Sequence, residues 1–172
     1  MKAKVLASFA LLVCLVLVNW SIYKKEHLLE HGQLVYLALA PVDPRSLMQG
    51  DYMALRFEMA RQINASLQST NENAEAMRKT AQDGYAIATL DNNQVGMFKG
   101  LYREQTLEGN EILMRYRLRN NQVKFATNAF FFQEGHAARY ENAKFGGFRV
   151  AKDGELLLVS LHDENLRNLA LD

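Results

Sequence analysis

The chain opens with an apolar segment whose length and flanks favour a membrane-spanning helix. The run Val5–Tyr23 has lysines on both sides, and Trp20 lies near its end. As an α-helix, its nineteen residues measure about 28 Å, close to the roughly 30 Å hydrocarbon core of a bilayer. Trp, Tyr and Lys are typical of the membrane–water interface. We expect residues 1–32 to form a membrane anchor with a juxtamembrane helix, and residues 33–172 to form one exported domain.

A cleaved signal peptide also begins with lysines and an apolar core, but small residues mark its cleavage site. Here the segment Asn19–Lys25 is bulky and charged, so we expect an uncleaved signal anchor. A lipoprotein signal would need a small residue before Cys14, and Val13 is not small. Because Cys14 is the only cysteine, the chain can form no intrachain disulfide, C-x-x-C redox pair or thiolate zinc cluster.

The orientation of the anchor follows from its short N-terminal tail. The lysines on its two sides are equal in number, so the positive-inside rule gives no preference. A tail this short before the apolar run favours a signal anchor, with the domain outside the cytoplasm.

Length and charge limit the kinds of partner. A chain of 172 residues has room for one domain rather than two. Its 20 basic and 19 acidic side chains leave a net charge of +1, so no overall field attracts nucleic acid or anionic lipid. Any partner must be recognised locally.

From Gln33 onward, short runs of alternating apolar residues are separated by turn-forming residues, which indicates antiparallel strands. The predicted strands are Gln33–Ala40, Asp51–Met59, Tyr85–Asp91, Gln94–Tyr102, Glu111–Arg119, Gln122–Phe132, Phe145–Ala151 and Glu155–Leu161. Hairpin turns are predicted at Asn92-Asn93, Asn120-Asn121 and Asp153-Gly154, because these residues tolerate a positive φ.

Two short helices interrupt the predicted strands. Asn71–Gln82 has basic residues late and Gly84 just beyond, and His136–Lys144 ends before Gly146. The expected fold class is therefore α+β, mainly antiparallel β, after an N-terminal transmembrane helix. A small barrel is an open alternative for the strands.

Three features could suggest chemistry, but each has a simpler explanation. His27-Leu28-Leu29-Glu30-His31 matches an inverted zinc-peptidase pattern, yet a juxtamembrane helical turn explains it and no third ligand is visible. Ser46 has no S-x-x-K or G-x-S-x-G context, so we expect a turn residue. His162 is predicted to be a surface residue. The sequence predicts no catalytic residue, no metal site and no cofactor.

The segment Gly50–Met59 reads GDYMALRFEM and predicts a turn followed by a strand. Met53, Leu55, Phe57 and Met59 would share the core face. Asp51 falls on that same face at the mouth of the strand, where it should need a partner. Arg45 or Arg139 could supply it, or the carboxylate could cap the turn.

These residues resemble the GDYXXLXY family of membrane-anchored bacterial proteins. Gly50, Asp51, Tyr52 and Leu55 match the motif, whereas Phe57 replaces its last tyrosine, which indicates packing at that position. The segments Pro41–Gln49, Phe130–Val150 and Leu157–Glu164 are also similar to the family. The resemblance implies an inner-membrane anchor and a β-rich domain on the periplasmic side, with no assigned reaction. Because some relatives resemble the tail of multi-pass membrane proteins, such a protein is the expected partner.

Two functions compete on these residues. The first is a non-enzymatic binding or accessory module for a multi-pass membrane protein or another envelope component, attached to lipid through its N-terminal helix. The second is a small envelope hydrolase or ligand-binding domain that uses the carboxylates of Asp51 and Glu134. The candidate binding residues are Asp43, Arg45, Asp51, Tyr52, Glu134, His136, Arg139 and Tyr140. For Tyr140, packing of a helical face on the sheet is the structural alternative.

Overall fold

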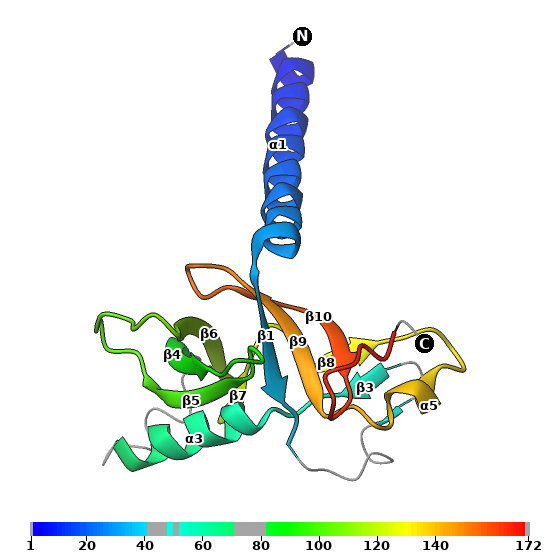
Figure 1. Ribbon diagram of the computed structural model, residues 1–172. Helices are drawn as coiled ribbons and strands as arrows, with labels where there is room; N and C mark the ends of the chain where they lie inside the picture. The colour runs from blue at the N-terminus through cyan, green and yellow to red at the C-terminus, as the bar shows by residue number, and fades with distance from the viewer. Residues whose placement is uncertain (1, 41–47, 50–51, 71–81, 171–172) are drawn as a thin grey trace.

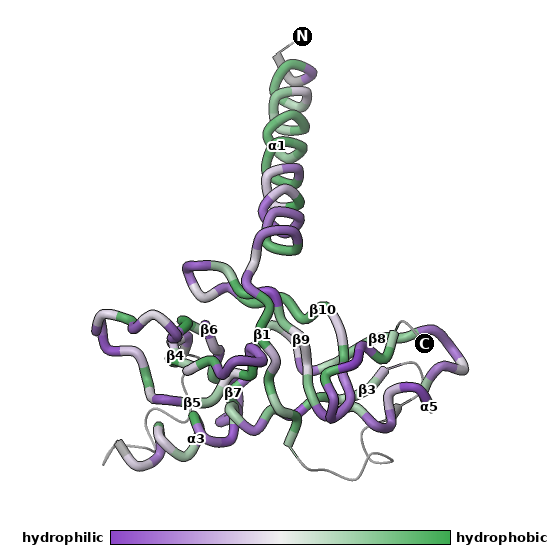
Figure 2. The backbone as a smooth tube through the Cα atoms, in the orientation of Figure 1, coloured by the Kyte–Doolittle hydropathy of each residue, from purple (hydrophilic) through white to green (hydrophobic). Residues whose placement is uncertain are grey.

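One long helix rises from a strand-rich domain (Figure 1). The structure is a computed structural model that describes residues 2–40, 48–49, 52–70 and 82–170. Helix α1 (Lys2–His31) is the one helix in these ranges that is long and apolar enough to cross a membrane. Figure 2 shows its apolar residues in the half remote from the domain and polar residues where it meets the domain.

The foot of α1 is attached directly to the domain. Leu28 is buried, and the Lys25 Nζ lies 2.5 Å from the Glu155 Oε1 in the hairpin between β9 (Phe145–Val150) and β10 (Leu156–His162). The Arg149 guanidinium donates to the Gly32 carbonyl over 3.0 Å. A Cβ at Gly32 would lie 2.5 Å from the Leu28 carbonyl oxygen, so glycine is required at this exit from the helix. The helix and the sheet therefore form one unit.

In the described residues, the domain contains three antiparallel sheets. The first has the order β1-β9-β10, where β1 is Gln33–Ala38. The second has the order β2-β3-β8, formed by Met48–Gln49, Tyr52–Ala54 and Ala129–Phe131. The third has the order β5-β4-β6-β7, formed by Gly96–Leu101, Gln82–Leu90, Glu111–Arg119 and Gln122–Lys124. These sheets confirm the predicted fold class, a strand-rich antiparallel domain behind an apolar helix.

The predicted hairpin turns join β4 to β5, β6 to β7 and β9 to β10. Asn120 and Asn121 have φ values of 51° and 58°, and Gly154 has 82°, as tight hairpins of this kind require. In the β4–β5 turn the positive φ falls instead on Gln94, at 63°.

The core lies between the sheets and α3 (Glu58–Thr70). Phe57 packs edge-on against Phe125 and Phe148, with ring centroids 6.0 and 5.2 Å apart. Val35 and Leu37 of β1 are fully buried beside them. The burial of this cluster ties the sheets together through apolar contact.

The prediction of a strand over Asp51–Met59 is wrong in its second half. The core face is as predicted, because Met53, Leu55, Phe57 and Met59 are all buried. However, β3 ends at Ala54, Phe57 makes an isolated bridge to Leu39, and α3 begins at Glu58. Met59, Ile63 and Leu67 follow at helical spacing and pack toward the core, so α3 continues the burial that the strand began.

Two other predicted segments differ from the structure, and a third cannot be placed. The helix expected at Asn71–Gln82 lies outside the described residues except for Gln82, which begins β4. The strand expected at Gln122–Phe132 is divided into β7 and β8, because the Thr127 hydroxyl bonds the N–H and carbonyl of Ala129 and stabilises a turn between them. The helix expected at His136–Lys144 is limited to α5 (Ala137–Tyr140).

Candidate functional site

Several of the predicted site residues cannot be placed. Asp43, Arg45 and Asp51 lie outside the described residues, and so does Ser46. The ion pair expected between Asp51 and Arg45 or Arg139 therefore stays a prediction. The same holds for the proximity of Asp51 to Glu134 that the hydrolase hypothesis requires.

The structure brings His136, Arg139 and Tyr140 together around an open hollow of about 500 Å³. The hollow lies where β8 runs into α5 and is also lined by Phe131, Phe132, Gln133 and Ala170. A turn closed by a 3.0 Å bond from the His136 N–H to the Gln133 carbonyl leads into α5. Gly135 has a φ of 82° in this turn, which explains a glycine there.

Tyr140 has a structural role. Tyr140 is only 6% exposed, and the centroid of its ring lies 5.2 Å from that of Phe130 and 5.3 Å from that of Phe132. These contacts fix α5 against β8. The packing alternative for Tyr140 therefore accounts for its position, although the residue also lines the hollow.

Tyr52 and Phe131 lie opposite each other in the β3–β8 pair. Their ring centroids are 5.7 Å apart, and Tyr52 is partly buried. Phe131 is 74% exposed, more than any other large apolar side chain of the described part of the domain. We call the surface formed by Tyr52, Phe131, His136 and Arg139 the β8–α5 surface.

Glu134 does not join this group. It is exposed in the turn before α5 and does not line the hollow. The β8–α5 surface thus presents an aromatic ring beside a guanidinium and an imidazole, without a carboxylate among the residues that line its hollow. Such a surface can bind apolar and polar groups of a partner.

Shifted pKa values occur elsewhere, and several belong to charged groups of the four-stranded sheet. The Arg115 and Arg119 guanidinium groups, 2.7 and 2.8 Å from the Asp83 carboxylate, hold its pKa below the usual value. A bond from the Glu108 N–H and the ammonium of Lys99 lower the pKa of Glu111. These groups are paired with each other, which indicates a structural role.

A buried pair of polar side chains was missed by the sequence reasoning. Ser160 and His162 are 8% and 5% exposed, so the prediction that His162 is a surface residue is wrong. The Ser160 Oγ lies 2.8 Å from the His162 Nε2, and the Nδ1 lies 3.0 Å from the Leu166 carbonyl. A Cβ at Gly147 would come within 2.7 Å of the Ser160 Oγ. Ser160 was on the predicted strand Glu155–Leu161 and His162 directly followed it, so their i, i+2 spacing was the available signal.

The Ser160–His162 pair has the spacing of a nucleophile and a base, but its role is structural. Neither residue lines a described pocket, and the Leu169 N–H donates to the Leu161 carbonyl beside them. His162 also bridges to Asn168 and lies edge-on to Tyr36. The pair therefore stabilises the packing of the C-terminal segment 166–169 against β10.

The histidines of the inverted zinc-peptidase pattern lie in the last two turns of α1. The rings of His27 and His31 stack with centroids 4.4 Å apart. Across the described ranges, no group of three or more His, Cys, Asp or Glu side chains is placed to hold a metal ion. The helical turns at the end of α1 account for both residues.

Comparison with known proteins gives one result. No curated protein and no solved structure matches the chain. A family model does match it over residues 14–161, from within α1 to within β10, and so includes the β8–α5 surface. Its span covers most of the helix and nearly all of the domain, and the chain therefore belongs to the GDYXXLXY protein family.

Proposed function

We propose that the protein is a single-pass, membrane-anchored binding module that recognises a membrane protein of the bacterial envelope through the β8–α5 surface. The exposure of Phe131 carries this proposal. Burying a phenylalanine side chain stabilises a complex by roughly 1.5–3 kcal/mol relative to leaving it in water. A ring that is 74% exposed beside Arg139 has the composition of an interaction hot spot, in which aromatic and arginine side chains dominate.

The backbone of β8 supports the same interpretation. In the order β2-β3-β8, this strand is at the edge of its sheet among the described residues. An edge strand presents unpaired backbone groups that can accept a further strand from a partner. Phe131 would then supply the apolar contact and the edge of β8 the hydrogen bonds.

An anchored domain would meet its partner at a membrane. Because α1 meets the domain at Leu28, Gly32 and the Lys25–Glu155 ion pair, an inserted α1 would hold the β8–α5 surface at a limited distance from the bilayer. Crossing of the inner membrane by α1, with the domain on the periplasmic side, belongs to the proposal. A reporter that is active only outside the cytoplasm, fused after residue 172, should be active. An inactive reporter would contradict this orientation.

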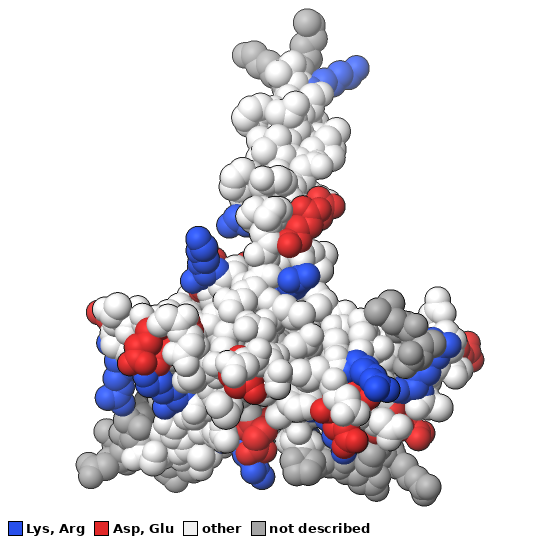
Figure 3. Space-filling model, in the orientation of Figure 1, with Lys and Arg blue, Asp and Glu red and all other residues white. Residues whose placement is uncertain are grey.

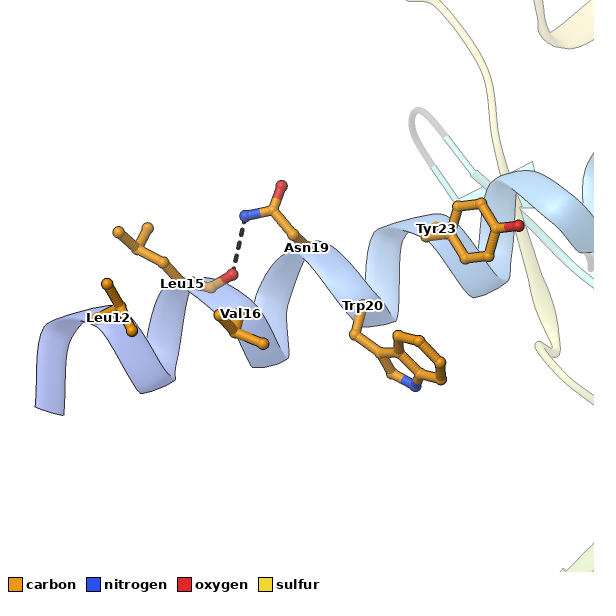
Figure 4. Close-up of a pocket in the computed structure, with 6 residues that line it drawn as sticks. All are labelled: Leu12, Leu15, Val16, Asn19, Trp20 and Tyr23. Carbon is orange, nitrogen blue, oxygen red and sulfur yellow. Dashed lines mark hydrogen bonds between the residues drawn. The ribbon is translucent and has the colours of Figure 1, made fainter. Parts of the chain in front are cut away.

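The stripe of α1 shown in Figure 4 offers a second contact for such a partner. Leu12, Leu15, Val16, Asn19 and Tyr23 are spaced along one side of the helix. The Asn19 amide donates to the Leu15 carbonyl over 2.8 Å, which leaves its oxygen as an acceptor for a neighbouring helix. Such packing within the bilayer would add to recognition by the domain.

Photo-crosslinking in intact membranes tests the β8–α5 surface. A benzoylphenylalanine at position 131 should crosslink to an integral membrane protein. The same group at position 97 should not, because Met97 is a comparably exposed apolar residue, at 57%, on β5 of a different sheet. Arg139→Ala should weaken the crosslink at 131 while the protein still melts cooperatively. Equal crosslinking from both positions, or none from 131, would exclude this surface.

A further inference from the structure

A second pocket lies at the foot of α1, between the anchor and the domain. It has a volume of about 240 Å³ and is lined by Lys25 of α1, Arg115 and Arg117 of β6, and Glu155 beside the β9–β10 hairpin. Phe125, Ala126 and Leu156 complete its wall. We call it the foot pocket. Figure 3 shows basic side chains together with acidic ones around the base of the helix.

The charges of the foot pocket are not balanced. Lys25 pairs with Glu155, and Arg115 pairs with Asp83, but Asp83 is also shared with Arg119. Arg117 has no carboxylate partner in the part of the chain that the structure describes. The pocket therefore has an excess of positive charge, although the whole chain is nearly neutral.

Arg117 is also held in place. Its Nη2 donates to the carbonyls of Phe125 and Ala126 over 3.5 and 3.0 Å. A guanidinium has five N–H donors, so the Nη1 and Nε groups remain for a ligand. A planar guanidinium with free donors and a fixed position suits a phosphate, which it can bind through two hydrogen bonds.

The anchor sets the height of the foot pocket relative to the bilayer. Lys25 is two residues beyond Tyr23, so it lies about 3 Å past the end of the apolar run along the helix axis. The headgroup layer on each side of a bilayer is roughly 5–8 Å thick, so this ammonium lies within it. Because the Glu155 carboxylate is 2.5 Å from Lys25, the hairpin side of the pocket reaches the same level.

We propose that the foot pocket binds the phosphate group of an anionic phospholipid in the leaflet next to the domain. Arg117 donates to the phosphate oxygens, and Lys25 and Arg115 supply the surrounding positive charge. The bound lipid would fix the angle between α1 and the domain, and so the direction in which the β8–α5 surface points. This inference rests on the proposed crossing of the bilayer by α1, and it adds a lipid ligand to the protein partner.

Native mass spectrometry of the full chain in detergent tests the lipid ligand. Phosphatidylglycerol and phosphatidylcholine with the same acyl chains are titrated separately. We expect the wild type to retain phosphatidylglycerol in preference to phosphatidylcholine. Arg117→Gln should weaken retention of phosphatidylglycerol about tenfold, since it removes a charge-assisted hydrogen-bond donor. Arg117→Lys should keep part of the preference.

Arg103→Gln is the matched control, because Arg103 is an exposed arginine after β5 and does not line the foot pocket. Equal retention of the two lipids by the wild type would overturn the proposal. So would an identical loss in the Arg103 and Arg117 variants. If free glycerol 3-phosphate binds as tightly as the lipid, the ligand is a soluble phosphate and the lipid assignment fails.

Two measurements distinguish a wrong proposal for the foot pocket from a protein that is unfolded or not inserted in the membrane. Thermal melts of each variant in detergent establish that the domain is folded. Resistance of the wild type to alkaline extraction from membranes establishes that α1 is inserted. An inserted, folded protein without lipid preference would refute the foot pocket alone, whereas a protein that alkali extracts would refute the anchor.

Discussion

The four-stranded sheet β5-β4-β6-β7 and the small sheet β2-β3-β8 are built in opposite ways. Strands β4 and β6 pair over eight positions, whereas β3 and β8 pair over three. Residues of β6 alternate between buried Met114 or Tyr116 and exposed Arg115 or Arg117. No residue of β8 is buried, and Phe131 points an aromatic ring into solvent.

The difference between the two sheets indicates which part of the domain can bind a partner. The large sheet pairs several of its charged side chains internally, Asp83 with two arginines and Glu111 with Lys99, and leaves Arg117 at the foot pocket. Long pairing and closed ion pairs give a rigid scaffold. The small sheet depends on contacts between aromatic rings, including those of Tyr140, and leaves one ring uncovered. The stability of the small sheet therefore depends on contacts within it, and its surface is available to a partner.

The largest expected change in stability comes from a cavity in the large sheet. Met114 is fully buried at the centre of β6, so Met114→Ala should lower the free energy of unfolding by about 2–5 kcal/mol. Because β6 lies beside both β4 and β7, the loss should be global. Urea unfolding of the full chain in detergent should show one transition at lower urea. A separate early transition would show that the sheet unfolds independently.

A smaller effect is expected from Tyr140→Ala in the small sheet. Loss of the ring contacts with Phe130 and Phe132 should cost about 2 kcal/mol, because the site borders an open hollow and can relax. Hydrogen exchange should become faster in β3, β8 and α5 while it stays unchanged in β4 and β6. Uniformly faster exchange would contradict the local stability of the small sheet.

The smallest effect concerns pH and the ion pairs of the large sheet. The pKa of Asp83 is lower in the folded protein because Arg115 and Arg119 favour its charged form. Its contribution to stability is therefore complete above the ordinary pKa of 3.8 and is lost as the pH falls through the lower pKa of the folded state. Asp83→Asn should lower the urea midpoint slightly at pH 6, and the difference from wild type should shrink at pH 3.

Glu164→Gln is the control for this pH dependence. Glu164 is an exposed carboxylate without an ion pair among the residues that the structure describes. Its substitution should leave the midpoints equal to those of the wild type at both values of pH. A difference between Asp83→Asn and wild type that does not change with pH would mean that the ion pairs are not its cause.

Much of the fold could be predicted because its signals are local. The apolar run, the period-two alternation of Glu111–Arg119 and the Asn120-Asn121 turn each depend on neighbouring residues. The helix α3 was missed because Phe57 and Met59 satisfy a strand pattern as well as the entry to a helix. The apolar residues of a strand or of a helix can both face the core, so the sequence pattern does not distinguish the two elements here. Only the packing against the core does.

The site was predicted in part for the same reason. His136 and Arg139 are close in sequence, so their joint position beside α5 followed from a short helix. The exposure of Phe131 could not be inferred, since three phenylalanines in series suggest burial on both faces. The buried Ser160–His162 pair depends on the C-terminal segment that folds back over it.

The sequence by itself determined the long apolar N-terminal helix, the antiparallel character of the domain, the hairpin turns and the membership of the GDYXXLXY protein family. Each of these rests on covalent order and on the period of side chains along a helix or strand. The tertiary structure alone decided which aromatic ring stays exposed and which basic side chains meet at the foot of α1. Those outcomes depend on segments far apart in the chain, because burial and charge balance are properties of the packed surfaces and not of local order.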